Sequence, residues 1–252
     1  MKFKSLSVAF LALILGLQAQ ANEGWSVGLG LVTSDNYPDQ AQSSGFFPAA
    51  SIGSKTAMVI PDLKYQWSQW ALGTSGLSWQ SKSDAPIMTR VQLGFPQSSL
   101  SVSGQQGWFR YGVYAGAEFT NGTRANVGAT VGPLSLEHHK GFSSSSDAYM
   151  NVVALGAPVF LGDKIPLAVI GKISVRNSSA AFKSDRLKLN TPLTEGIYTD
   201  IDVNFFAISP VSDNLTFINS VTFRKADRSQ QTQVDGLKEL HVNVFSLVSY
   251  SF

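Results

Sequence analysis

The chain has 252 residues, of which 14% are charged, and it holds 22 glycines, 16 phenylalanines and no cysteine. A charged fraction well below the roughly 25% of soluble domains favours a membrane protein. The absence of cysteine excludes a disulfide scaffold, thiol chemistry and thiolate zinc sites. The 19 basic side chains exceed the 17 acidic ones by only two, so the charge balance indicates no nucleic-acid partner.

The first 21 residues have the pattern of a secretory signal peptide. Lys2 and Lys4 precede an apolar run over 7–17, and Ala19-Gln20-Ala21 is a small-residue cleavage site. The apolar run is too short to span a bilayer. We therefore expect residues 1–21 to be removed, and residues 22–252 to form a single domain.

Apolar and polar residues alternate along most of the remaining chain, which is typical of strands. The clearest runs cover 25–32, 109–119, 125–131, 201–207 and 215–223. Further candidates cover 47–52, 57–65, 70–79, 88–95, 100–105, 134–139, 149–160 and 165–176. Polar stretches at 33–45, 141–147, 177–194 and 225–238 are predicted as the outer loops.

The last strand, over 242–252, ends the chain on an aromatic residue. Its alternate positions Val248 and Tyr250 are apolar, and Phe252 is the C-terminal residue. A closing strand of this kind is typical of a Gram-negative outer-membrane barrel. We predict that Phe252, Tyr250 and Val248 form an assembly signal for the barrel-assembly machinery.

An exported chain without a membrane helix can stay in a bilayer only as a closed barrel, because lipid offers no partners for free backbone groups. We therefore predict an all-β fold, a transmembrane antiparallel β-barrel of about twelve strands, with ten as the alternative. Its location is the outer membrane, with outer-membrane lipid as a partner. A soluble β-sandwich is the competing fold.

Aromatic residues fall mostly near the predicted strand ends. Tryptophan and tyrosine gather where a bilayer meets water, because each has an apolar ring and a polar tip. We predict that Trp25, Trp70, Trp79, Trp108 and Tyr111 lie at the membrane interfaces.

Residues that could carry chemistry are few. Glu137-His138-His139 holds the only pair of histidines, and neighbours on a strand point to opposite faces, so the two cannot bind one metal ion. Nucleophile-elbow, zinc-protease and P-loop motifs are absent from the sequence. We expect no catalytic residue, no metal and no cofactor; a hydrolase acting at the barrel rim is the less favoured alternative.

Several short stretches resemble the MipA/OmpV family of outer-membrane proteins. They are 36–39 with 47–50, the Gly-Pro step in 131–136, the arginine-containing segment 223–229 and the closing Tyr250-Ser251-Phe252. The resemblance covers nearly the whole mature chain. It implies a non-enzymatic scaffold or interaction protein, with a periplasmic murein hydrolase and a murein synthase as partners. A small-solute pore and an adhesin are the alternatives.

Overall fold

A computed structural model describes residues 23–35, 49–52, 55–74, 76–82, 86–94, 97–106, 109–119, 123–142, 148–162, 167–187, 189, 191–234 and 237–252. The predicted signal peptide and Trp108 lie outside these residues, as do the family-like stretch 36–39 and the first two residues of 47–50.

The described part of the chain is almost entirely strand, with two short helices. The strands of its first half are β1 (Gly24–Asp35), β2 (Ala49–Ile52), β3 (Lys55–Trp67), β4 (Trp70–Gly73), β5 (Gly76–Gln80), β6 (Ile87–Leu93), β7 (Gln97–Gln106) and β8 (Phe109–Glu118). The second half holds β9 (Arg124–Val131), β10 (Leu134–Gly141), β11 (Tyr149–Leu161), β12 (Ala168–Ser179), α2 (Ala180–Leu187), β13 (Ile197–Pro210), β14 (Leu215–Lys225), α3 (Arg228–Gln231) and β15 (Leu240–Ser251).

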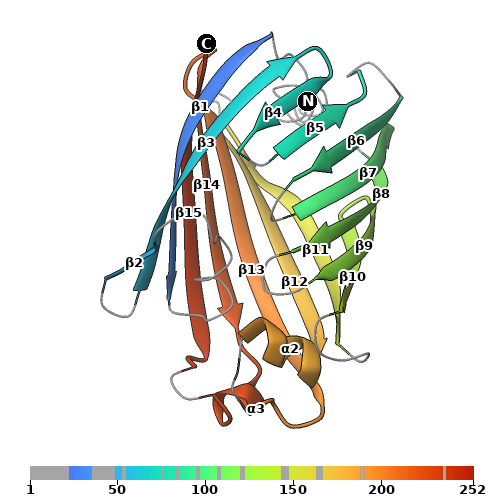
Figure 1. Cartoon of the computed structure of the whole chain (residues 1–252), viewed down its shortest axis with the longest axis vertical. Helices are drawn as coiled ribbons and strands as arrows, with labels where there is room; N and C mark the ends of the chain where they lie inside the picture. Colours follow the sequence, from blue (N-terminus) through green and yellow to red (C-terminus); the bar gives the residue numbers. More distant parts are fainter. Residues whose placement is uncertain are drawn as a thin grey trace, which may run out of the picture.

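The strands form a closed antiparallel barrel (Figure 1). From β3 to β15 each strand pairs with its neighbour in sequence, and β1 pairs with both β15 and β3, which closes the ring. The short β2 pairs only with β3 and stands outside this ring. The predicted all-β barrel is confirmed.

The ring contains fourteen strands, so the predicted twelve, and the alternative ten, are wrong. One reason is the segment 70–79, which alternates like one strand but contains a turn that divides it into β4 and β5. Gly76 at this turn has φ +102°, and a Cβ there would lie 2.3 Å from the carbonyl oxygen of Leu93. Only glycine adopts this backbone without strain, so the chain reverses here.

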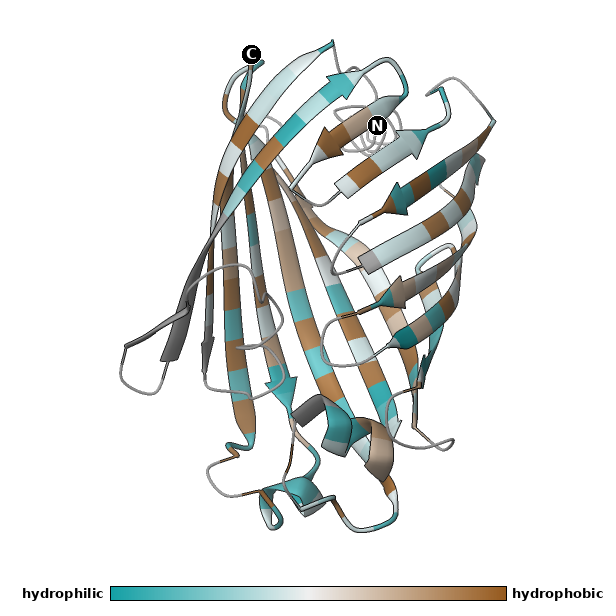
Figure 2. Cartoon of the chain, viewed as in Figure 1, coloured by the Kyte–Doolittle hydropathy of each residue, from teal (hydrophilic) through white to brown (hydrophobic). Residues whose placement is uncertain are grey.

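The outer face of the barrel is apolar. On β1 the side chains of Trp25, Val27, Leu29 and Leu31 are exposed, whereas the alternate Gly28 and Gly30 are buried. Figure 2 shows brown and paler bands alternating along the long strands. A closed barrel with an apolar exterior is stable only in lipid, which places the chain in the outer membrane. Among the described residues, no helix is long and apolar enough to cross a membrane.

The two ends of the barrel differ. β1 begins and β15 ends at the same end, whereas α2 and α3 lie at the opposite end (Figure 1). Outer-membrane barrels have short periplasmic turns and longer external loops. The connections after β12 and β14 fall in the stretches 177–194 and 225–238, which the sequence predicts as outer loops. We therefore assign this end of the barrel to the outside of the cell. We call this end the loop end and the other the terminus end.

Candidate functional site in the barrel lumen

Charged side chains gather on the inner face of β12, β13 and β14 near the loop end. Asp202 accepts two hydrogen bonds from Arg224, at 2.9 Å from Nε and 3.3 Å from Nη2, and pairs with Nη2 of Arg176 at 2.6 Å. Asp202 and Arg224 are only 2% exposed. One carboxylate bridges two guanidinium groups, so the three strands are joined by a buried ionic cluster.

A second acid, Asp200, connects both helices to this wall. Its carboxylate pairs with the buried Lys183 of α2, and it accepts hydrogen bonds from Nε2 of Gln230 at 3.0 Å and from the backbone N–H of Asp227 at 3.1 Å. Gln230 belongs to α3. The segments that contain α2 and α3 both contact the inward carboxylate of Asp200. These contacts attach both segments to the inner side of β13.

Helix α2 also packs against the inner wall further around the barrel. Phe182 is fully buried in a cluster with Ala148, Met150 and Val152. The guanidinium carbon of Arg124, on β9, lies 5.6 Å from the centre of the Phe182 ring. This distance allows a cation–π attraction. The helix therefore covers the inner wall from β9 to β13 at the loop end.

Asp227, at the loop end before α3, stays ionised to low pH. Burial pushes its pKa up, but hydrogen bonds from Ser229 and from the backbone N–H of Thr199 outweigh burial and lower the pKa below its ordinary 3.8. The carboxylate accepts from the backbone N–H groups of Ser229 and Thr199, each at 2.8 Å. It caps α3 and links that helix to β13.

A separate polar cluster centres on Glu137 of β10. Its carboxylate lies 3.3 Å from Nε2 of His139 and 3.8 Å from Nζ of Lys172. Tyr114 from β8 lies over Gly128, where a Cβ would come within 2.4 Å of its ring. The groups around Glu137 are thus a base, a cation and a phenol.

The three histidines are separated, as the sequence predicted for the neighbouring pair. His138 faces outward and its Nδ1 lies 2.8 Å from Oδ1 of Asn151, whereas His139 faces the lumen beside Glu137. His241 is buried on β15 opposite Arg224. Within the described ranges, no group of three or more His, Cys, Asp or Glu residues could hold a metal ion.

The predicted interface aromatics that the structure describes lie at the terminus end. Trp25, Trp70 and Tyr111 are exposed on the outer face, and Trp79 is half-exposed. The rings of Trp70 and Trp79 lie 6.5 Å apart, and Trp25 lies 4.9 Å from Tyr65. Their position at one rim fits an interfacial belt.

The predicted assembly-signal residues lie close to that belt. Val248 and Tyr250 face outward, and Phe252 is 75% exposed. The backbone N–H of Phe252 donates to the carbonyl oxygen of Trp25 at 2.9 Å, and its ring lies 5.0 Å from that of Tyr250. The chain end is thus accessible and lies beside the start of β1.

Sequence reasoning missed the ionic cluster. Arg176, Asp202 and Arg224 occupy inward positions of strands, and Lys183 lies in a stretch predicted as a loop. The available signal was charge at inward positions of three successive strands. Which charges meet depends on cross-strand register, which alternation alone does not give.

Comparison with known proteins supports the fold and no more. No family model and no curated protein matches the chain. Among solved structures, a bacterial polysaccharide outer membrane secretin superposes with a TM-score of 0.51 at 10% identity, covering 92% of this chain and 100% of that one. A loop-deletion mutant of OmpT, an outer membrane protein of Vibrio cholerae, gives 0.45 at 9% identity over 92% and 99%. An anion-selective porin from Comamonas acidovorans gives 0.43 at 9% identity over 90% and 98%. The first of these similarities, together with the closed ring and its apolar exterior, establishes that the chain has an outer-membrane β-barrel fold.

Proposed function

We propose that this barrel is a non-enzymatic scaffold or interaction protein of the outer membrane. One observation carries the proposal: α2 covers the inner wall at the loop end, and the charges of Asp200 and Asp202 beside it are paired and buried. A pore for polar solutes needs charged or polar groups exposed to water along its passage. Here Asp202 and Arg224 neutralise one another instead of facing such a passage.

The resemblance to the MipA/OmpV family suggests the kind of partner. It implies a periplasmic murein hydrolase and a murein synthase, held together at the outer membrane. Such partners would meet the terminus end of the barrel, where the turns are short and the chain finishes. In this proposal the barrel supplies a rigid membrane anchor and takes no part in the chemistry of its partners.

The test combines capture of partners with conductance. Cross-linked envelopes should yield murein enzymes with the tagged barrel, and the purified barrel in a planar bilayer should give no stepwise ion conductance. Stepwise conductance without any murein enzyme among the cross-linked proteins would overturn the scaffold in favour of a pore.

A pore is the second candidate, and the polar inner face of the shorter strands favours it. Ser99, Ser101 and Ser103 of β7 share the inward face with Tyr114. If α2 closes such a passage, Phe182→Ala combined with Lys183→Met should release the helix and raise conductance. Lys225→Met is the matched control, because Lys225 pairs with Glu239 in an exposed ion pair.

The rim hydrolase can be tested at His139, the histidine beside an acid. We expect the double variant His138→Gln with His139→Gln to capture the same partners as wild type, because a scaffold needs no general base. A hydrolase would lose roughly two to four orders of magnitude in rate. The measurement is lipid and peptide hydrolysis in detergent, with folding checked by heat-modifiable mobility. A wild-type activity that the folded variant lacks would contradict a non-enzymatic role.

A further inference from the structure

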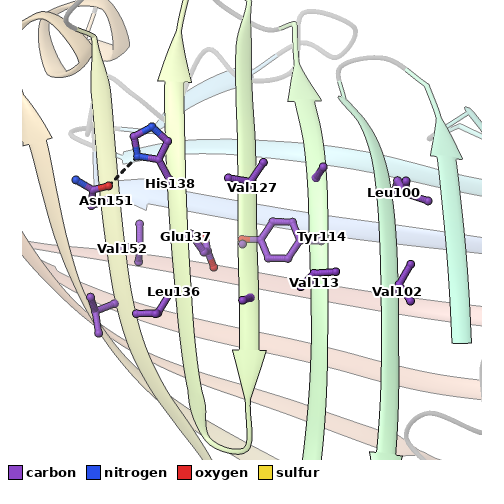
Figure 3. Close-up of a pocket in the computed structure, with 14 residues that line it drawn as sticks. Leu100, Val102, Val113, Tyr114, Val127, Leu136, Glu137, His138, Asn151 and Val152 are labelled. Carbon is purple, nitrogen blue, oxygen red and sulfur yellow. Dashed lines mark hydrogen bonds between the residues drawn. The ribbon is translucent and has the colours of Figure 1, made fainter. Parts of the chain in front are cut away.

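An apolar groove of about 680 Å³ crosses the outer face of β7 to β11 (Figure 3). Exposed side chains of Leu100, Val113, Val127, Leu136 and Val153 line it. The small side chains Ala115 and Ala129, also on the outer face, leave room between the larger ones. Because this face of the barrel lies in the membrane, lipid chains are the material available to fill the groove.

The groove has a polar corner on β10 and β11, on the side toward the loop end. Figure 3 shows His138 and Asn151 joined on β10 and β11, with Val127 as the cross-strand neighbour of His138 on β9, and both polar side chains are exposed on the outer face. Asn151 pairs across the sheet with Asn177, which pairs in turn with Thr199. Cross-strand neighbours lie about 5 Å apart, so these four residues form a row roughly 14 Å long.

The hydrogen bonds within this row do not use the amide N–H donors of its two asparagines. The Oδ1 atom of Asn151 accepts from Nδ1–H of His138, because two acceptors cannot bond one another. Oδ1 of Asn177 accepts from the hydroxyl of Thr199 at 2.9 Å. Each asparagine amide keeps an NH₂ group with two N–H donors. The row therefore presents two adjacent NH₂ groups on the lipid-facing side of the barrel.

The charged side chains near the row favour an anion at the His138 end of the row rather than at the Thr199 end. Lys140 shares the outward face of β10 with His138, two residues nearer the loops. The acid Asp227 lies at the opposite end of the row, where it accepts from the backbone N–H of Thr199. An anion is therefore favoured beside His138 and Asn151, at the β10 and β11 side of the apolar groove.

We infer that this groove and donor row bind an outer-leaflet lipid with a phosphate-bearing headgroup. The acyl chains lie against Val127, Leu136 and Val153, and the phosphate oxygens accept hydrogen bonds from the amides of Asn151 and Asn177. Lys140 adds a positive charge at headgroup depth. Hydrogen bonds to a charged group in a site that is partly shielded from water are stronger than those between neutral groups.

The experiment measures lipid retained by the purified barrel, by native mass spectrometry, with lipid A and with its dephosphorylated form as probes. Wild type should retain lipid A about tenfold or more better than the dephosphorylated form. Asn151→Leu with Asn177→Leu should remove that preference while the barrel stays folded. Asn219→Leu is the matched control, because Asn219 is also an exposed outward asparagine but pairs with Ala207 and Ser246.

A second variant tests the groove itself. Ala115→Trp should fill the groove and lower retention of both probes, with heat-modifiable mobility unchanged. Equal retention of the two lipids by wild type would overturn the inference, as would an unchanged preference in the double asparagine variant. A dimer in detergent that Ala115→Trp dissociates would also overturn it, because a second copy of the chain would then cover the groove.

Discussion

The barrel has two unequal walls. β11 to β15 together with β1 and β3 are 11 to 14 residues long, whereas β4 to β10 are 4 to 10 residues long. Figure 1 shows the shorter strands together on one side. At about 3.3 Å per residue a strand of twelve residues reaches about 40 Å, well beyond an apolar band of about 25 Å. A strand of four or five residues reaches less than that band.

This difference in strand length determines where the ionic cluster and the lipid-facing groove lie in the barrel. The long wall extends past the membrane at the loop end, and its extra length carries the ionic cluster together with α2 and α3. At its shorter neighbour β10, His138 and Asn151 of the adjacent β11 form the polar side of the apolar groove. The ionic cluster of Asp202 thus belongs to the long wall, and the lipid-facing groove belongs mainly to the shorter one.

The largest effect is expected from breaking the ionic cluster of the long wall. Asp202→Ala leaves Arg176 and Arg224 without their shared carboxylate, which should lower the free energy of unfolding by about 3–5 kcal/mol. Glu118→Ala in the short wall should cost less, because Glu118 is itself 39% exposed, although its partner Arg124 is buried. Urea unfolding in detergent gives both values, and equal losses would contradict the contrast between the walls.

The faces of the long wall can be compared directly. Phe205 faces lipid near the middle of β13, so Phe205→Arg should cost about 2–4 kcal/mol. Ser220→Arg places the same side chain on the inner face of the adjacent strand and should cost much less. Folding titrations into vesicles measure both changes. Similar penalties at the two positions would show that the assigned faces are wrong.

The pH dependence of the loop end follows from Asp227. Its pKa is lowered in the folded state, so its carboxylate stabilises the fold above the ordinary value of 3.8, and this contribution is lost as the pH falls through the lower folded pKa. Asp227→Asn keeps a capping oxygen but should remove this part of the acid sensitivity. Unfolding free energies of wild type and variant between pH 5 and pH 2 provide the test; parallel curves would contradict it.

The smallest effect on stability is expected at the chain end, where the effect on assembly should be clear. Phe252 is exposed, so its deletion should change the free energy of unfolding by less than about 1 kcal/mol. If Phe252 is part of the assembly signal, the same deletion should lower the folded yield in the outer membrane. An unchanged yield and unchanged heat-modifiable mobility would argue against that role.

Local patterns in the sequence were enough to predict strands and faces. Alternation predicted that Val248 and Tyr250 face outward and that His138 and His139 point to opposite sides. Together with the apolar closing strand it predicted an outer-membrane barrel, which the closed ring confirms. These features depend on a period of two residues, so they can be read without knowing which strands meet.

The tertiary structure alone decided the strand number, the ionic cluster and the groove. The turn at Gly76 divides one alternating segment into two strands, while β2 stays outside the ring. The meeting of Arg176, Asp202 and Arg224, and of Asn151 with Asn177, requires the register of neighbouring strands. Alternation gives each residue a face but no height along the barrel, because register is set by contacts between residues far apart in the chain.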